Sequence, residues 1–102
     1  MIVFWSTPAI DDLKAIQVYI AQGSEYYAAE FIRKVLEVVD KLEQFPEVGR
    51  VIPEIQDPHA RELVFQSYRI LYRLGKDRLD IAAVIHGRRD VQKEIPRRWE
   101  IL

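Results

Sequence analysis

Apolar residues open the chain and then recur at two different spacings, which divide it into a helical half and a strand half. Ile2–Trp5 is a run of β-branched and aromatic residues that predicts a short buried strand. Ser6 or Thr7 can cap a helix start by accepting from free N–H groups, and Pro8 suits the first turn because it has no N–H group to satisfy there. A helix is predicted over residues 8–22, ended by Gly23, with an apolar stripe at Ala9, Leu13, Ile16 and Ile20.

A second, longer amphipathic helix follows, and Ser24 is suited to cap it. Its apolar residues repeat at intervals of three and four, at Phe31, Val35, Val38, Leu42 and Phe45, widened by Ala28, Ile32 and Val39. Two such helices in succession predict a helical hairpin that lays one apolar face on the rest of the fold.

Beyond the helices, proline and glycine interrupt the pattern and the apolar spacing then changes to two. Residues 46–59 are predicted to form a loop, long enough to suggest a functional role. Three strands are predicted at Arg61–Phe65, Tyr68–Leu74 and Leu79–His86, joined by short turns. The predicted fold is α+β, in the order β-α-α-β-β-β, with the helical hairpin packed on one face of an antiparallel sheet.

Short turns also predict which strand residues are opposite each other. The expected pairs are Leu74 with Leu79, Tyr72 with Ile81, Ile70 with Ala83, and Tyr68 with Ile85. These eight residues make one apolar face, where the helices are expected to lie. The opposite face would hold Arg69, Leu71, Arg73, Asp80, Ala82, Val84 and His86.

Two features of that opposite face suggest chemistry. Arg73 lies across from Asp80, which predicts an ion pair. Arg69 lies near His86 without a carboxylate in the same hairpin, which makes it a candidate anion-binding residue. The alternative is that Arg69 pairs with the C-terminal tail or with Glu62, which would share this face opposite Leu71.

Composition limits the class of protein. A chain of 102 residues that is 49% apolar suits one domain over residues 1–102. The absence of cysteine excludes disulfides and thiolate zinc sites, and the two histidines are far apart, so we expect neither metal nor cofactor. No apolar run reaches the length of a membrane helix and residues 1–6 do not resemble a signal peptide, so we expect a cytoplasmic protein without membrane contact.

The formal net charge of −1 hides an uneven distribution. Residues 1–60 carry ten acidic against five basic residues, whereas residues 61–102 carry six against ten. Residues 88–102 are predicted to form a basic C-terminal tail, next to Arg69 and His86. The charge split therefore suggests a basic working surface in the C-terminal half.

Five segments carry a further signal through their order and spacing. They are Val3–Ala9 with Asp12 and Leu13, Phe45–Arg50, Arg61–Leu63, Ser67–Arg73 and Val84–Asp90. Together they resemble the RelE/ParE superfamily of toxins from bacterial type II toxin-antitoxin systems. The family's fold of a strand, a helical hairpin and an antiparallel meander agrees with the one that periodicity predicts. The resemblance implies a growth-inhibiting toxin that forms a hetero-oligomer with its cognate antitoxin.

The superfamily has two known modes of action, and the resemblance leaves a choice between them. RelE-like members cleave messenger RNA on the ribosome, whereas ParE-like members poison DNA gyrase. For the RelE-like alternative, the resemblance implies Arg69, His86 and Arg89 as catalytic residues, because arginines stabilise a charged phosphate and histidine transfers protons near neutral pH.

Departures from RelE favour the ParE-like branch. Ile95 stands where RelE has a tyrosine, and residues 54–60 lack the lysine pair that RelE has ahead of its strand arginine. The segment His86–Asp90 instead matches ParE-like members. For gyrase poisoning we expect target contacts from five residues in the C-terminal half, namely Arg69, His86, Arg88, Arg89 and Lys93.

Two further questions stay open at this point. A non-toxic, degenerate member that serves as an antitoxin-binding module or corepressor is a second alternative. Trp5 ends an apolar strand and is predicted to lie in the core. Trp99 could contact the domain, contact an antitoxin, or remain mobile with the terminus.

Overall fold

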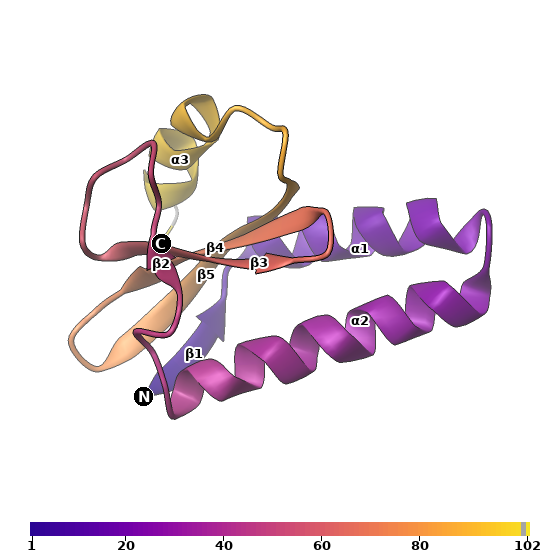
Figure 1. The fold of residues 1–102 in the computed structure, drawn as a ribbon, viewed down its shortest axis with the longest axis horizontal. Coiled ribbons are helices and arrows are strands. Elements are labelled where there is room, and N and C mark those ends of the chain that lie inside the picture. The colour runs from indigo at the N-terminus through magenta and orange to yellow at the C-terminus, as the bar shows by residue number, and fades with distance from the viewer. Residues whose placement is uncertain (101) are drawn as a thin grey trace.

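The computed structural model describes residues 1–100 and 102, and it shows a sheet with helices on both faces (Figure 1). The elements are, in order, β1 (Ile2–Trp5), α1 (Thr7–Ala21), α2 (Glu25–Asp40), the 3-10 turn η1 (Lys41–Glu43), β2 (Arg50–Val51), β3 (Ala60–Phe65), β4 (Tyr68–Leu74), β5 (Arg78–His86) and α3 (Val91–Glu100). The predicted α+β order is confirmed. None of the described helices combines the length and apolar character needed to cross a membrane.

The five strands lie in the order β1-β5-β4-β3-β2. Strands β3 to β5 form the predicted antiparallel meander. Strand β2 adds to it antiparallel to β3, and β1 pairs in parallel with β5, which makes the sheet mixed. The loop predicted over residues 46–59 contributes the short edge strand β2. The meander therefore builds one continuous sheet around the central strands β4 and β5.

The hairpin of α1 and α2 covers one face of this sheet, as predicted (Figure 1). Both caps are confirmed, because the hydroxyl oxygen of Ser6 accepts a hydrogen bond from Ala9 N–H and that of Ser24 accepts one from Tyr27 N–H. Trp5 contributes to this core, also as predicted. The buried residues of this first cluster are Ala9, Phe31, Val35, Val39, Leu42, Ile70, Tyr72, Leu79, Ile81 and Val84.

The predicted register of β4 and β5 is right near their turn and wrong beyond it. Tyr72 pairs with Ile81, as expected, but Ile70 pairs with Val84 and Tyr68 with His86. The difference is a β-bulge at Ala82, which adds one residue to β5 between these levels. Because one extra residue moves all later side chains to the other face, Val84 joins the first cluster, while Ala83 and Ile85 lie on the opposite face.

Side chains from both terminal helices hold the bulge in place. Asp12 of α1 accepts a hydrogen bond from the backbone N–H of Val84 at 2.9 Å. Arg98 of α3 donates to the carbonyl oxygen of Ala82 at 2.9 Å and makes a two-bond ion pair with Asp12. The backbone groups of the bulge are thus satisfied by residues that lie far from it in sequence.

The C-terminal segment differs most from its prediction. Residues 91–100 of the predicted basic tail form the helix α3, which packs on the face of the sheet away from α1 and α2 (Figure 1). Trp99 packs beside this second cluster, with the Arg73 guanidinium 5.8 Å from its ring centre, so it contacts the domain. The face that was expected to be open is therefore partly covered. The buried residues of the second cluster are Ile52, Ala60, Leu71, Ala83, Ile85, Val91 and Ile95.

Candidate target-binding groove

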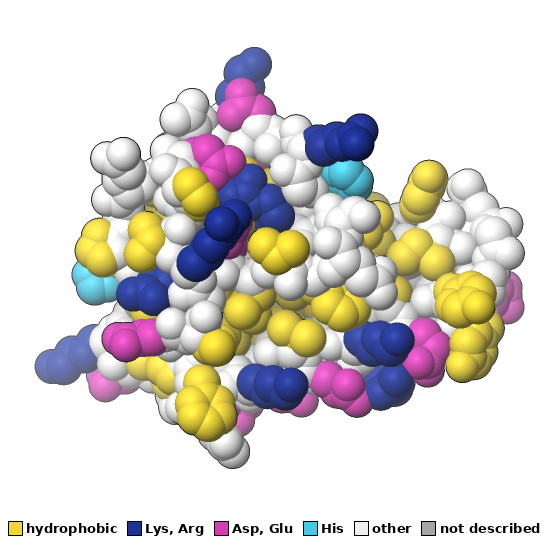
Figure 2. All heavy atoms as spheres, viewed as in Figure 1, with side chains coloured by type: hydrophobic (Ala, Val, Ile, Leu, Met, Phe, Trp, Pro, Cys, Tyr) yellow, Lys and Arg dark blue, Asp and Glu magenta, His cyan; other side chains and the backbone are white. Residues whose placement is uncertain are grey.

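A groove of about 690 Å³ lies beside Arg69, between the β3–β4 turn, the end of β5 and the loop after β2. Its polar lining includes Arg50, Glu54, Tyr68, Arg69, His86 and Arg88, and we call it the Arg69 groove. Figure 2 shows basic, acidic and histidine side chains gathered on this part of the surface. Three of the five predicted target-binding residues, Arg69, His86 and Arg88, thus come together.

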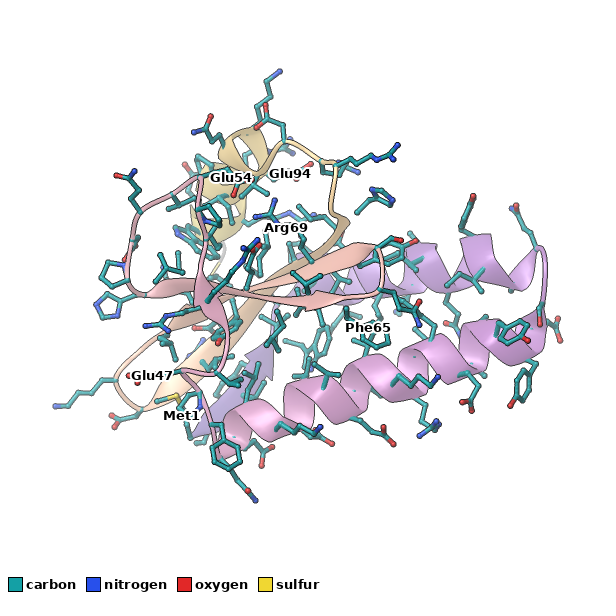
Figure 3. The ribbon with its side chains drawn as sticks, in the orientation of Figure 1. Met1, Glu47, Glu54, Phe65, Arg69 and Glu94 are labelled. Atoms are coloured by element: carbon teal, nitrogen blue, oxygen red, sulfur yellow. The ribbon has the colours of Figure 1, made fainter. Side chains whose placement is uncertain are left out.

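Arg69 forms the floor of the groove through ion pairs with two carboxylates. Its Nη1 and Nη2 each donate to one oxygen of Glu54 at 2.8 Å, and its Nε donates to Glu62 Oε2 at 2.5 Å. Figure 3 shows Arg69 and Glu54 pointing toward each other. The alternative of an ion pair with Glu62 is therefore confirmed, and the interpretation of Arg69 as an unpaired cation is wrong.

The second oxygen of Glu62 binds another arginine. Arg50 of β2 donates from Nε to Glu62 Oε1 at 2.7 Å. The side chain of Glu62 is fully buried, whereas that of Arg50 is 63% exposed. Glu62 therefore links Arg69 at the floor of the groove to the exposed Arg50 at its rim. The position of Glu62 opposite Leu71 is as predicted, but nothing in the sequence pattern pointed to Arg50 as its second partner.

These contacts keep the network charged. Hydrogen bonds from Arg69 lower the pKa of Glu54 below its ordinary value, against the opposing effect of burial. The hydrogen bonds that Arg69 donates to Glu54 in turn raise the pKa of Arg69. Both groups are accordingly ionised at neutral pH, and Glu54 neutralises part of the positive charge that the sequence concentrates here.

His86 and Arg88 lie at the end of β5. The Nδ1 atom of His86 accepts a hydrogen bond from the backbone N–H of Arg88 at 3.2 Å. The His86 ring meets the ring of Tyr68 edge-on, with 5.7 Å between their centres. The side chains of His86 and Arg88 are exposed at the rim of the groove.

Arg89 and Lys93, the other two predicted contact residues, lie outside the groove. Arg89 forms an ion pair with Glu94 and lines a second, charged cavity beside Asp12 and Arg98. Lys93 is exposed on α3. The three residues implied as catalytic for a RelE-like enzyme, Arg69, His86 and Arg89, therefore do not meet at one place.

The ion pair predicted between Arg73 and Asp80 is wrong, although the two residues are opposite each other in the sheet. Asp80 instead binds Arg78 on its own strand, with a shortest distance of 2.7 Å. Arg73 lies over Trp99 of α3, which sequence reasoning had not placed on this face. The helix α3 thus provides a competing partner for this arginine.

Sequence reasoning also missed Glu54, because its partner comes from a strand 15 residues later and no local pattern links the two. Arg50 was part of a segment that carried the family resemblance, but it had no assigned role. Both residues depend on the position of the loop between β2 and β3, which only the folded chain defines.

Comparisons with known proteins define the class of this molecule. Residues 3–91 match the family model of the ParE toxin of the type II toxin-antitoxin system parDE. Toxin ParE1 of Mycobacterium tuberculosis is 30% identical over 69 residues, which cover 67% of this chain and 69% of that protein. A solved structure of a chromosomal ParDE toxin-antitoxin system from P. aeruginosa superposes with a TM-score of 0.70, at 22% identity, over 84% of this chain and 95% of the other.

The chain therefore belongs to the ParE toxin family of type II toxin-antitoxin systems. Membership implies a cognate antitoxin as its partner, as the resemblance had suggested. The structural likeness supports the fold, with its strand, helical hairpin, mixed sheet and C-terminal helix.

Proposed function

We propose that this toxin inhibits growth by poisoning DNA gyrase. We further propose that the Arg69 groove, which includes Arg88, contacts the target together with Arg89 and Lys93 outside it. Membership of the ParE family supports the class of activity. The structural observation that carries the choice of target is the position of Arg89. A RelE-like catalytic set would need it beside Arg69 and His86, but it is paired with Glu94 outside the groove.

The dispersal of the RelE-like catalytic set supports the same choice. Metal-independent RNA cleavage needs a base, an acid and phosphate-stabilising cations around one reacting group. Arg69 and His86 line the groove, but Arg89 is engaged with Glu94 outside it. The cations that are exposed beside the groove, Arg88 and Lys93, are positioned for contacts with an acidic surface.

The first experiment tests the target. Purified toxin is added to DNA gyrase and plasmid, and covalently cleaved DNA is trapped with detergent. We expect cleaved complexes to rise with toxin concentration and to disappear when the cognate antitoxin is added. Primer extension on cellular messages after induction is the matched assay for the RelE-like alternative. Codon-linked cuts in messages without trapped DNA breaks would contradict the proposal.

A second experiment tests the contact residues. Combined Arg88→Gln and Lys93→Gln substitutions remove two exposed charges at the proposed surface, whereas Lys14→Gln with Lys76→Gln removes two exposed charges elsewhere. We expect the first pair to lower gyrase inhibition about tenfold, equivalent to about 1.4 kcal/mol of binding free energy, and the control pair to leave it unchanged. Equal losses in both variants would contradict the assignment of the surface.

Induced expression of the protein without the antitoxin distinguishes an active toxin from a non-toxic binding module. We expect growth arrest that the antitoxin relieves. Normal growth with a folded, antitoxin-binding protein would instead support the alternative of a binding module or corepressor.

A further inference from the structure

We propose that the Arg69 groove is a binding site for a terminal phosphate group, and that the carboxylate of Glu54 fills this site when no such ligand is bound. The ligand class is a phosphate monoester of nucleotide size. This inference concerns a small ligand of the toxin itself, so it goes beyond the proposed action on gyrase and does not depend on it.

The geometry of Arg69 provides the first argument. Its two Nη atoms bind both oxygens of Glu54 in parallel at 2.8 Å, which is the fork arrangement that arginine uses for carboxylates and phosphates alike. Its Nε is separately bonded to the buried Glu62. Because Glu62 orients the guanidinium from behind, the fork keeps its direction when Glu54 leaves.

The two carboxylates differ in how easily they can leave. Glu62 lies on β3, is fully buried, and binds both Arg50 and Arg69, so its departure would strand a buried charge. Glu54 lies on the loop between β2 and β3 and its side chain is 35% exposed. It can rotate into water, where a carboxylate is well solvated, at low cost. Glu54 is therefore the exchangeable group.

The charge balance favours a terminal phosphate. Arg50, Arg69 and Arg88 bring three positive charges to the groove, and Glu54 and Glu62 bring two negative ones. When Glu54 moves away, the balance rises from +1 to +2. A terminal phosphate carries about −1.5 to −2 charges at pH 7, so it matches this site better than a single carboxylate or a phosphodiester does.

The size and aromatic lining of the groove fit a nucleotide. Its volume of about 690 Å³ lies within the range usual for small-molecule sites. The edge-on rings of Tyr68 and His86 stand beside the arginines and offer an apolar surface to a base. The same phosphate chemistry is present in a free nucleotide and at the phosphorylated end of a nucleic acid.

Calorimetric titration of the full chain tests the proposal. The ligand is adenosine monophosphate, and adenosine, which lacks the phosphate, is the control compound. We expect Glu54→Gln to bind adenosine monophosphate about tenfold more tightly than wild type, because the internal competitor is removed. The matched control Glu43→Gln, an exposed carboxylate outside the groove, should bind like wild type. Adenosine should bind to none of the three proteins, namely wild type, Glu54→Gln and Glu43→Gln.

A second substitution tests whether the tighter binding of adenosine monophosphate by Glu54→Gln takes place in the groove. It leaves the ion pairs of Glu62 with Arg50 and Arg69 unchanged. Arg88→Gln changes an exposed residue, so the fold should persist. In the Glu54→Gln background we expect it to weaken binding of adenosine monophosphate about tenfold. Unchanged affinity in this double variant would overturn the proposal, as would a Glu54→Gln variant that binds no more tightly than wild type.

Oligonucleotides with a 5′-phosphate or a 5′-hydroxyl group separate the sources of phosphate. Tighter binding of the 5′-phosphorylated oligonucleotide would support a nucleic-acid end, and binding of adenosine monophosphate alone would support a free nucleotide. Equal binding of both oligonucleotides would overturn the terminal-phosphate assignment, because phosphodiesters would then suffice. A Glu-rich peptide that binds as tightly as the phosphorylated ligands would also overturn it. Gyrase is absent from these titrations, so their failure and the failure of the proposed function are distinguishable.

Discussion

Tyr72 shows how one hydroxyl group can shape the rim of the groove. The side chain is fully buried on β4, and its oxygen accepts a hydrogen bond from Gly49 N–H and donates one to the carbonyl oxygen of Pro46, both at 2.9 Å. Burial raises the pKa of this phenol, so it remains a donor at neutral pH. These bonds hold the chain just before Arg50, which then reaches Glu62.

Glycine is required at position 49 by this close approach. A Cβ atom there would lie 2.7 Å from the carbonyl oxygen of Glu62 and would also collide with the Tyr72 hydroxyl. Both are parts of the central sheet that cannot easily move. The pairing of β2 with β3, and with it the place of Arg50, depends on this missing side chain.

Replacing Tyr72 by phenylalanine tests the role of the hydroxyl. The substitution leaves the buried N–H of Gly49 without its acceptor, so we expect the free energy of unfolding to fall by about 1–3 kcal/mol. Chemical denaturation measures the change. Tyr19→Phe removes a hydroxyl from an exposed residue and should have almost no effect. Equal stability of the two variants would show that the hydroxyl does not hold the loop.

The ion pair between Glu54 and Arg69 should make the stability of the fold depend on pH. Because Arg69 holds the pKa of Glu54 below its ordinary value of 4.5, the folded protein binds this proton less readily than the unfolded chain. The ion pair therefore stabilises the fold above about pH 4.5, and this contribution is lost as the pH falls through the folded pKa.

Chemical denaturation of wild type and Glu54→Gln at pH values above and below 4.5 measures how the ion pair's contribution to the free energy of unfolding changes with pH. Since Glu54 is partly exposed, solvent screening limits the expected difference to about 0.5–1 kcal/mol at neutral pH. The difference should narrow below about pH 4.5. A difference that widens in acid would contradict the ion pair.

At the scale of elements, α1, β5 and α3 are joined through a single carboxylate. Asp12 satisfies the Val84 N–H freed by the bulge and also binds Arg98, whose hydrogen bonds to Asp12 raise the arginine's pKa. The bulge in turn places Ala83 and Ile85 under α3. The carboxylate of Asp12 thus links the shifted part of β5 to α3.

Asp12→Asn should loosen both features together. An amide keeps one acceptor but loses the ion pair with Arg98, and we expect a loss of about 1–3 kcal/mol in the free energy of unfolding. Amide hydrogen exchange that is faster in Asp12→Asn than in wild type, both at Val84 and along α3, would show that Asp12 holds β5 and α3 together. The neighbouring Asp11 is exposed, so Asp11→Asn is the matched control and should change neither. Exchange that rises in α3 but not at Val84 would separate the two features.

At the scale of the whole molecule, one sheet separates two apolar clusters that fold as a unit. The first lies beneath the α1–α2 hairpin and includes Trp5 at its edge, and the second lies beneath α3 and includes Trp99. Since β4 and β5 contribute residues to both clusters, opening one face exposes the other side of the same strands. The structure therefore predicts a single cooperative transition.

The two tryptophans allow this to be measured. Trp99→Phe leaves Trp5 to report on the first cluster, and Trp5→Phe leaves Trp99 to report on α3. For each single-tryptophan variant we expect the fluorescence transition to coincide with its own far-ultraviolet circular dichroism transition. A Trp99 transition at lower denaturant would mean that α3 detaches before the sheet unfolds.

Local patterns were enough to predict the hairpin, its caps, the three long strands and the general order of the fold. Each depends on residues within a few positions of one another, such as Ser24 with Tyr27 or the turn between Leu74 and Leu79. The helix α3 was not predicted because its apolar stripe consists of only two buried residues, Val91 and Ile95. The stripe lies in a segment that also contains Pro96 and, over residues 88–98, five basic residues. Such a stripe is informative only beside a surface that can bury it.

The sequence by itself determined the first strand, the helical hairpin, the three long strands, the family and the concentration of positive charge after residue 60, because periodicity, capping and composition are local properties. Only the tertiary structure decided the bulge at Ala82, the cover provided by α3, and the partners of each arginine. Several of the deciding contacts join groups far apart in the sequence: Glu54 and Arg69 are 15 positions apart, and Asp12 and Arg98 are 86 positions apart. Charge pairing follows distance in space, so the arginine that looked free along the chain is held between two carboxylates once the loop after β2 folds over it.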